Sequence, residues 1–81
     1  MKQYTKEEIS LHKNKQDCWI IIRNKVYDIT SFLNIHPGGS GILMTVGGKD
    51  ATEYFEELHK EEILTKIGET YMIGLVQSSK L

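Results

Sequence analysis

His36-Pro37-Gly38-Gly39 is the stretch that decides how this chain of 81 residues is interpreted. Proline disfavours helical geometry in the residue before it, so His36 is expected to be extended, with its imidazole standing clear of the preceding turn. The two glycines permit a tight turn and carry no side chain that would obstruct a flat ligand. The motif is therefore suited to presenting one imidazole to a planar group.

A second histidine, His59, ends a helical pattern further along the chain. Asp50 and Glu53 have the spacing of a capping box, which predicts that a helix begins there. His59 follows Phe55 by one helical repeat of four residues, so both side chains are expected on one face. That face is otherwise apolar and consists of Ala51, Tyr54, Phe55 and Leu58.

The length of the chain predicts one domain, residues 1–81, with a small core. Domains of roughly 60–80 residues bury little surface and often need a metal, a disulfide or a cofactor. The single cysteine, Cys18, excludes an intrachain disulfide and is expected to be a small buried hydrophobe. The C-x-x-C-H signature of covalently attached haem is absent from the sequence, so any haem would be held non-covalently.

Composition argues against two classes of partner. The chain has 10 basic and 11 acidic residues, without the basic excess that nucleic-acid binding needs. No apolar stretch approaches the roughly 20 residues of a membrane-spanning helix, and the beginning MKQYTKEE lacks an apolar signal core. We therefore expect no nucleic acid, no membrane insertion by this segment, and the cytoplasm as the simplest location.

Short helices and strands account for the rest of the chain and predict an α+β domain. Thr5 caps a helix that is expected to run to about Lys13. Two β-branched and aromatic runs, 18–22 and 26–29, predict a hairpin with Asn24 in its turn. The other predicted elements are a helical turn at Phe32 and Leu33, helices at 41–46 and 60–67, and a strand at 71–76 that is covered on both faces.

The two histidines suit haem better than zinc. A structural zinc site needs four ligands, and the remaining candidates are poor, because Cys18 begins a predicted buried strand and His12 is expected to be exposed on the first helix. Haem iron already has four equatorial nitrogens, so it requires from the protein only two axial ligands and an apolar slot.

The sequence resembles the cytochrome b5 family from Tyr4 to Val76. Trp19 and the closing Met72-Ile73-Gly74 fit that family. Its other shared motifs are Val26-Tyr27-Asp28-Ile29-Thr30, Phe32-Leu33, His36-Pro37-Gly38-Gly39, Gly48-x-Asp50-Ala51-Thr52 and Phe55-x-x-Leu58-His59. The resemblance implies a cytochrome b5-like α+β fold, in which a small mixed β-sheet carries two short helical pairs that form a haem crevice.

The same resemblance implies a ligand set. Haem b (iron protoporphyrin IX) would be bound with His36 and His59 as axial ligands. The backbone carbonyls of Gly39 and Phe55 would accept hydrogen bonds from the two imidazoles. Other residues that match positions lining the pocket are Phe32, Leu43, Phe55 and Leu58.

Membership of this family would make the chain a monomeric electron carrier and not an enzyme. The expected donor is a flavin reductase, and the expected acceptor is a haem or non-haem iron protein. One alternative is a relay domain cut from a larger oxidoreductase, because the motif Phe55-x-x-Leu58-His59 resembles that of cytochrome domains fused to flavin or molybdenum enzymes. A second is a non-redox module like the steroid-receptor-type relatives, but these lack this histidine pair.

The charges around the predicted crevice differ from those of microsomal family members. Lys60 stands where those proteins carry a serine, and residues 40–48 are uncharged where the relatives carry carboxylates. Acidic residues gather near His59 instead, at Glu53, Glu56, Glu57, Glu61 and Glu62. They form either a solvated helix face or a one-sided docking patch for a basic partner.

Overall fold

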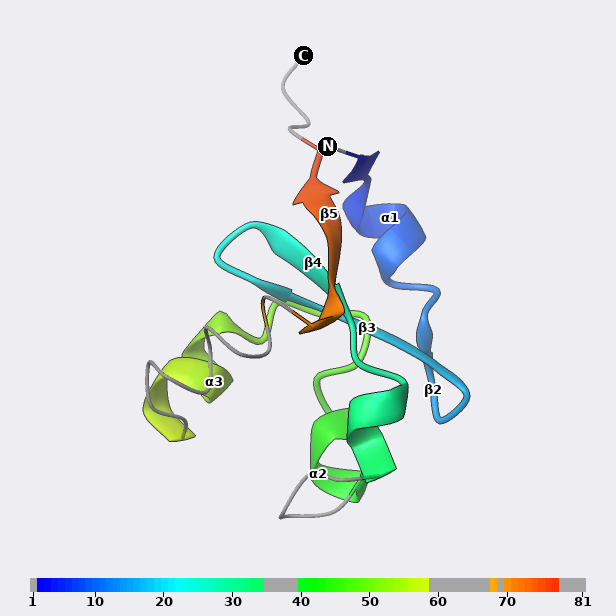
Figure 1. Ribbon diagram of the computed structural model, residues 1–81, viewed down its shortest axis with the longest axis vertical. Coiled ribbons are helices and arrows are strands. Elements are labelled where there is room, and N and C mark those ends of the chain that lie inside the picture. The colour runs from blue at the N-terminus through cyan, green and yellow to red at the C-terminus, as the bar shows by residue number, and fades with distance from the viewer. Residues whose placement is uncertain (1, 35–39, 59–67, 69, 78–81) are drawn as a thin grey trace.

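A computed structural model describes residues 2–34, 40–58, 68 and 70–77. A five-stranded sheet in the order β1-β5-β4-β3-β2 is its frame, with α1 near one end and α2 and α3 near the other (Figure 1). The elements in chain order are β1 (Gln3–Tyr4), α1 (Lys6–Ile9), β2 (Lys13–Asn14), β3 (Asp17–Ile22), β4 (Lys25–Asp28), the 3-10 helix η1 (Ser31–Asn34), α2 (Ser40–Met44), α3 (Thr52–Leu58) and β5 (Met72–Val76).

The predicted hairpin is confirmed as β3 and β4. Ile22 pairs with Lys25, so only Arg23 and Asn24 form the turn. Their φ angles are 52° and 67°, and two consecutive positive φ angles are what a type I′ turn requires. Asn24 takes the left-handed conformation as predicted, and Arg23 takes it as well.

The first helix is shorter than predicted. The Glu8 N–H donates to Thr5 Oγ1 at 3.0 Å, which confirms the cap, but the helix ends at Ile9 instead of about Lys13. Lys13 pairs with Cys18 in the antiparallel β2–β3 ladder. The prediction was wrong because backbone pairing with a strand later in the chain outweighs local helix propensity.

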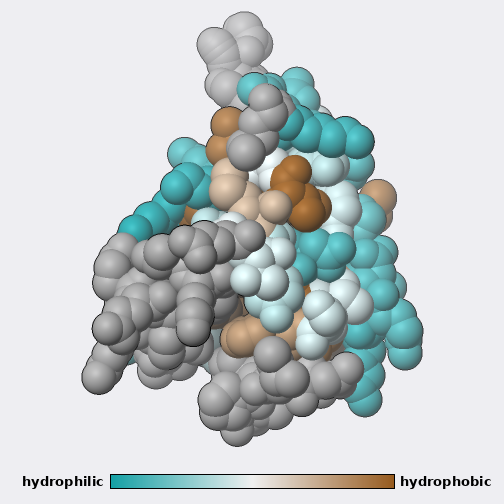
Figure 2. Space-filling view, in the orientation of Figure 1, coloured by the Kyte–Doolittle hydropathy of each residue, from teal (hydrophilic) through white to brown (hydrophobic). Residues whose placement is uncertain are grey.

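β5 confirms the predicted closing strand but is less covered than expected. It lies between β4, with which it is antiparallel, and β1, with which it is parallel. Only Gly74 of its residues is buried, and the rest are partly exposed. Figure 2 shows apolar surface near the centre of the view, where Figure 1 places β5. The two-residue β1 escaped prediction because so short a strand has no sequence periodicity.

The sheet separates two apolar clusters. Successive side chains of β3 point to opposite faces, so Ile20 and Ile22 enter one cluster and Ile21 enters the other. The smaller cluster, on the side of α1, contains Ile9, Ile21 and Val26. The buried members of the larger cluster are Cys18, Ile20, Ile22, Tyr27, Ile29, Leu33, Leu43, Ala51 and Phe55.

The chain before α3 pairs with the free edge of β3. The Gly48 N–H donates to the Trp19 carbonyl at 2.6 Å, and the Ile21 N–H donates to the Lys49 carbonyl at 3.0 Å. The Ala51 N–H returns a bond of 2.7 Å to the Ile21 carbonyl. Gly48 has φ 73°, as expected for a glycine that follows a helix, although α2 ends at Met44 and not at residue 46. These bonds fix where α3 begins.

The helix expected at 60–67 lies outside the described residues. The helical turn predicted at Phe32 and Leu33 lies within them and is confirmed as η1.

Replacing Gly74 by Ala should destabilise the fold. A Cβ there would lie 2.6 Å from the Lys2 carbonyl oxygen and 2.7 Å from Cε2 of Tyr4, so β1 must move away from β5. We expect a loss of about 1–3 kcal/mol in the free energy of unfolding, measured by urea denaturation. Gly41→Ala is the matched control, because its Cβ meets nothing within 4 Å. Alanine in a helix is more stabilising than glycine by about 0.5–1 kcal/mol, so this variant should be at least as stable as the parent. Equal stability of the two variants would contradict the close approach at Gly74.

Candidate functional site

Three of the predicted pocket residues meet in the larger apolar cluster. Phe32 comes from η1, Leu43 from α2 and Phe55 from α3. Leu43 and Phe55 are fully buried, and Phe32 is half-buried. The structure thus assembles an apolar wall from three elements that are separate in the sequence.

The other predicted site residues are not described. His36, Gly39 and His59 lie outside the described residues, and the same holds for the side chain of Leu58, the last residue of α3. Within the described ranges, no three His, Cys, Asp or Glu residues lie close enough together to hold a metal ion.

Hydrogen bonds at the end of β4 orient η1 and Phe32. Asp28 Oδ1 accepts from the Thr30 N–H at 3.1 Å and from the Thr30 hydroxyl at 2.6 Å. The same hydroxyl accepts from the Cys18 N–H at 3.0 Å, which ties the turn back to β3. The Phe32 N–H then donates to the Ile29 carbonyl at 2.9 Å and starts the 3-10 helix.

The side chain of Asp50 bonds to Thr52, the first residue of α3, instead of forming the capping box predicted with Glu53. Its Oδ1 accepts from the Thr52 N–H at 2.9 Å and from the Thr52 hydroxyl at 2.6 Å. The Phe55 N–H donates to the Ala51 carbonyl at 3.0 Å, so the first helical turn places Phe55 one repeat from buried Ala51. Both residues therefore face the larger cluster, as the sequence pattern predicted.

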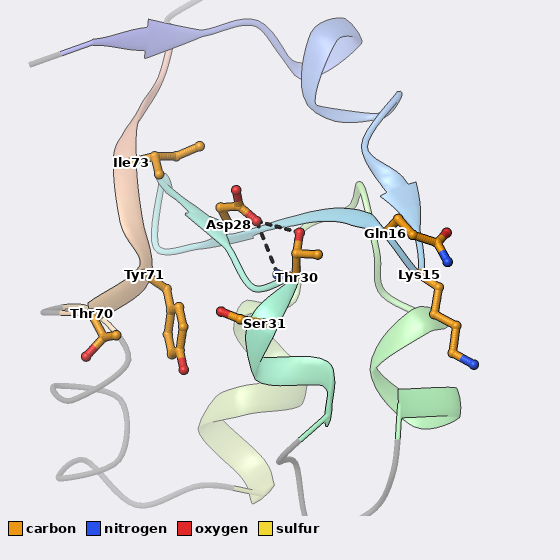
Figure 3. A pocket seen from close by; sticks show the side chains of 8 residues that line it. All are labelled: Lys15, Gln16, Asp28, Thr30, Ser31, Thr70, Tyr71 and Ile73. Atoms are coloured by element: carbon orange, nitrogen blue, oxygen red, sulfur yellow. Dashed lines mark hydrogen bonds between the residues drawn. The ribbon is translucent and has the colours of Figure 1, made fainter.

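Tyr71 is a residue of this region that the sequence analysis did not single out. Its ring centroid lies 5.5 Å from that of Phe32, at an interplanar angle of 56°. It also lines an open cavity of about 800 Å³ next to β4 and β5 (Figure 3). The other lining residues are Lys15, Gln16, Asp28, Thr30, Ser31, Thr70 and Ile73. Its position at the start of the apolar run 71–76 was the only signal in the sequence.

His12 is neither helical nor fully exposed, contrary to prediction. It lies between α1 and β2, and its ring stacks on Trp19 with centroids 3.6 Å apart and planes 3° apart. Its Nδ1 lies 2.8 Å from both carboxylate oxygens of Asp17, to which it donates. Trp19 packs on the cluster beside α1, so His12 is on the opposite face of the sheet from Phe55. The stacking on Trp19 and the bond to Asp17 explain why His12 is only partly exposed.

Cys18 is a buried hydrophobe, as predicted. Its side chain is fully buried in the larger cluster, and a Cβ on Gly47 would lie 3.0 Å from its sulfur. Burial, followed by the negative charges of Asp28 and Asp17, raises the pKa of the thiol to about 11. A thiol so protected is a poor metal ligand and a poor nucleophile at neutral pH.

The chain matches known proteins over most of its length. A sequence model of the cytochrome b5-like heme/steroid binding domain matches residues 5–77. The chain belongs to the cytochrome b5 family. It is 48% identical over 73 residues to cytochrome b5 of Rhizopus stolonifer, which covers 90% of this chain and 56% of that protein. It is 41% identical over 80 residues to cytochrome b5 of Borago officinalis, covering 99% and 61%.

Solved cytochrome b5 structures share the fold. Cytochrome b5 of Ostreococcus tauri virus 2 superimposes with a TM-score of 0.84 at 41% identity, covering 91% of this chain and 95% of that one. Cytochrome b558 of Ectothiorhodospira vacuolata, described as a prokaryotic homologue of cytochrome b5, gives 0.81 at 29% identity, covering 93% and 98%. The expected α+β cytochrome b5-like fold is therefore confirmed.

Family membership makes this a haem-binding domain. The apolar wall of Phe32, Leu43 and Phe55 fits the apolar body of a porphyrin. The chain spans less than two thirds of the Rhizopus and Borago proteins. Among the described residues, no helix has the length and apolar character needed to cross a membrane.

Cys18 should resist alkylation in the native protein. At pH 8 a thiol of pKa about 11 has roughly 100-fold less thiolate than one at the ordinary value of 9.0, so iodoacetamide should react about 100-fold more slowly than with the unfolded chain. Because folding raises this pKa, the thiol's contribution to stability is complete below pH 9 and is lost as pH rises towards 11. Mass spectrometry of timed samples measures the rate. Equal rates in native and urea-unfolded protein would refute this burial.

Proposed function

We propose that the chain is a one-electron carrier that holds non-covalent haem b between His36 and His59. The observation that carries the proposal is the family match over residues 5–77, joined to the buried wall that Phe32, Leu43 and Phe55 build. Bound haem would supply a ferric/ferrous couple. We propose that residues 1–81 act as a single monomeric domain in the cytoplasm.

The chain's own residues would control that couple in two ways. Each imidazole would present a neutral ring nitrogen to the iron, and its other nitrogen would donate to the carbonyl of Gly39 or Phe55, which would fix the tautomer and ring plane. With His36 and His59 both holding the iron, small molecules would have no open coordination site. Leu43 and Phe55 would exclude water from the pocket.

The partners we propose are a flavin reductase as donor and a haem or non-haem iron protein as acceptor. The described surface supports an uneven electrostatic field for such encounters. Exposed Glu53 and Glu57 lie on α3, whereas the described part of α2 carries no charged residue. Glu56 is also exposed, but its Oε2 accepts from Arg23 Nε at 2.6 Å, so part of its charge is compensated.

Ligation by two imidazoles should appear in the visible spectrum of the haem-loaded chain. The dithionite-reduced protein should show the sharp bands of low-spin six-coordinate haem and bind carbon monoxide poorly. His36→Ala and His59→Ala should each open a coordination position and allow rapid carbon monoxide binding. His12→Ala is the matched control and should leave the spectrum unchanged, because His12 lies on the other face of the sheet. A high-spin parent spectrum would overturn the proposed ligand pair.

The salt dependence of electron transfer should come from α3. Replacing Glu53 and Glu57 together by Gln should slow reduction of a basic acceptor such as cytochrome c at low ionic strength and flatten its dependence on salt. Glu56→Gln alone should do less, since Arg23 already offsets that charge. Stopped-flow rates over a range of ionic strengths measure both effects.

The control for this experiment is the pair Glu7→Gln and Glu8→Gln on α1. Both glutamates are exposed, and α1 packs on the opposite face of the sheet from α3. If this double variant changed the salt slope as much as the α3 variant does, the acidic residues of α3 would be an ordinary solvated face.

A further inference from the structure

Arg23, the only arginine of the chain, occupies an unfavourable backbone conformation. It is the first residue of the β3–β4 turn, with φ 52°. Type I′ turns favour glycine, asparagine and aspartate here, because other side chains with a Cβ are strained in the left-handed region. A residue keeps such a strained conformation only where its contacts with the surrounding structure hold it there.

Arg23 makes two contacts with α3. Its backbone N–H donates to Thr52 Oγ1 at 2.8 Å, and its Nε donates to Glu56 Oε2 at 2.6 Å. Thr52 and Glu56 are one helical repeat apart, so they lie on one face of α3. The Thr52 hydroxyl passes the connection on to Asp50 Oδ1 at 2.6 Å. A single residue of the hairpin thereby holds the first two turns of the helix.

α3 depends on such contacts for its orientation. Its seven described residues would not form a stable helix by themselves in water. The bond from the Ala51 N–H to the Ile21 carbonyl sets where the helix begins, but not its rotation about its own axis. Buried Phe55 faces the larger cluster, and Arg23 holds a second face. Two contacts on different faces determine the rotation.

We propose that Arg23 is a positioning residue for the haem site. By holding Thr52 and Glu56 it sets the rotation of α3, the helix that carries the wall residue Phe55 and precedes His59 in the sequence. The proposal rests on the proposed function, in which His59 is an axial ligand. Arg23 acts through the helix and does not itself touch the haem.

The test uses the haem-loaded chain and the variants Arg23→Asn and Glu56→Gln. Asparagine suits a positive φ, so Arg23→Asn keeps the turn and its backbone N–H while removing the side-chain contact. Lys25→Gln and Glu57→Gln are matched controls, because they remove the same charges from exposed positions next to the turn and on α3.

Two measurements are needed. Haem transfer to excess apomyoglobin gives the rate of release, and we expect about threefold faster release from either variant, as fits a partly exposed ion pair. The double variant should release haem no faster than the single ones. The hyperfine-shifted haem methyl signals of the ferric protein report the imidazole plane. They should move in the same sense in both variants, and Arg23→Lys should partly restore them.

The outcomes separate the two proposals. If the parent chain shows no six-coordinate haem spectrum, the proposed function fails. If the parent binds haem as expected but Arg23→Asn and Glu56→Gln keep its release rate and methyl shifts, the positioning role of Arg23 is overturned. Equal effects from Lys25→Gln and Glu57→Gln would also overturn it, because net charge would then explain the change.

Discussion

The backbone hydrogen bonds on the two edges of β3 are the interaction on which the rest of the structure depends. One edge pairs with β4 from Trp19 to Ile22. The other edge holds β2 first and then residues 48–51, the segment that leads into α3. Because the side chains of β3 alternate between faces, the same strand contributes to both apolar clusters. Its position therefore sets the sheet, the two cores and the start of α3 together.

The walls of the proposed haem site are attached to this frame by polar contacts at the ends of strands. Asp28 and Thr30 turn the chain from β4 into η1 and bring Phe32 to the larger cluster. Asp50 and Thr52 do the same at the entrance to α3 and bring Phe55 there. Each pair uses the same arrangement, in which an aspartate Oδ1 accepts from the N–H and the hydroxyl of a threonine two residues later. Such local bonds stop one element and start the next.

The charge on the described surface is distributed unevenly between α2 and α3. The described part of α2 is uncharged, whereas α3 exposes Glu53, Glu56 and Glu57. The Arg23–Glu56 pair reduces the acidity of α3 while joining the helix to the hairpin. One contact thus affects both the position of a site wall and the field that a redox partner would encounter.

The sequence by itself determined the family, the hairpin with Asn24 in its turn, the Thr5 cap, a helix that starts soon after Asp50, and the apolar wall of Phe32, Leu43 and Phe55. Each of these depends on residues close together in the chain or on a spaced motif. Only the tertiary structure decided that α1 ends at Ile9, that His12 stacks on Trp19 and pairs with Asp17, that Tyr71 backs Phe32, and that Arg23 holds α3. The contacts of Tyr71 with Phe32 and of Arg23 with α3 join residues far apart in sequence, whereas the end of α1 and the His12 contacts depend on the pairing of β2 with β3. Local propensity and periodicity therefore carry no record of them.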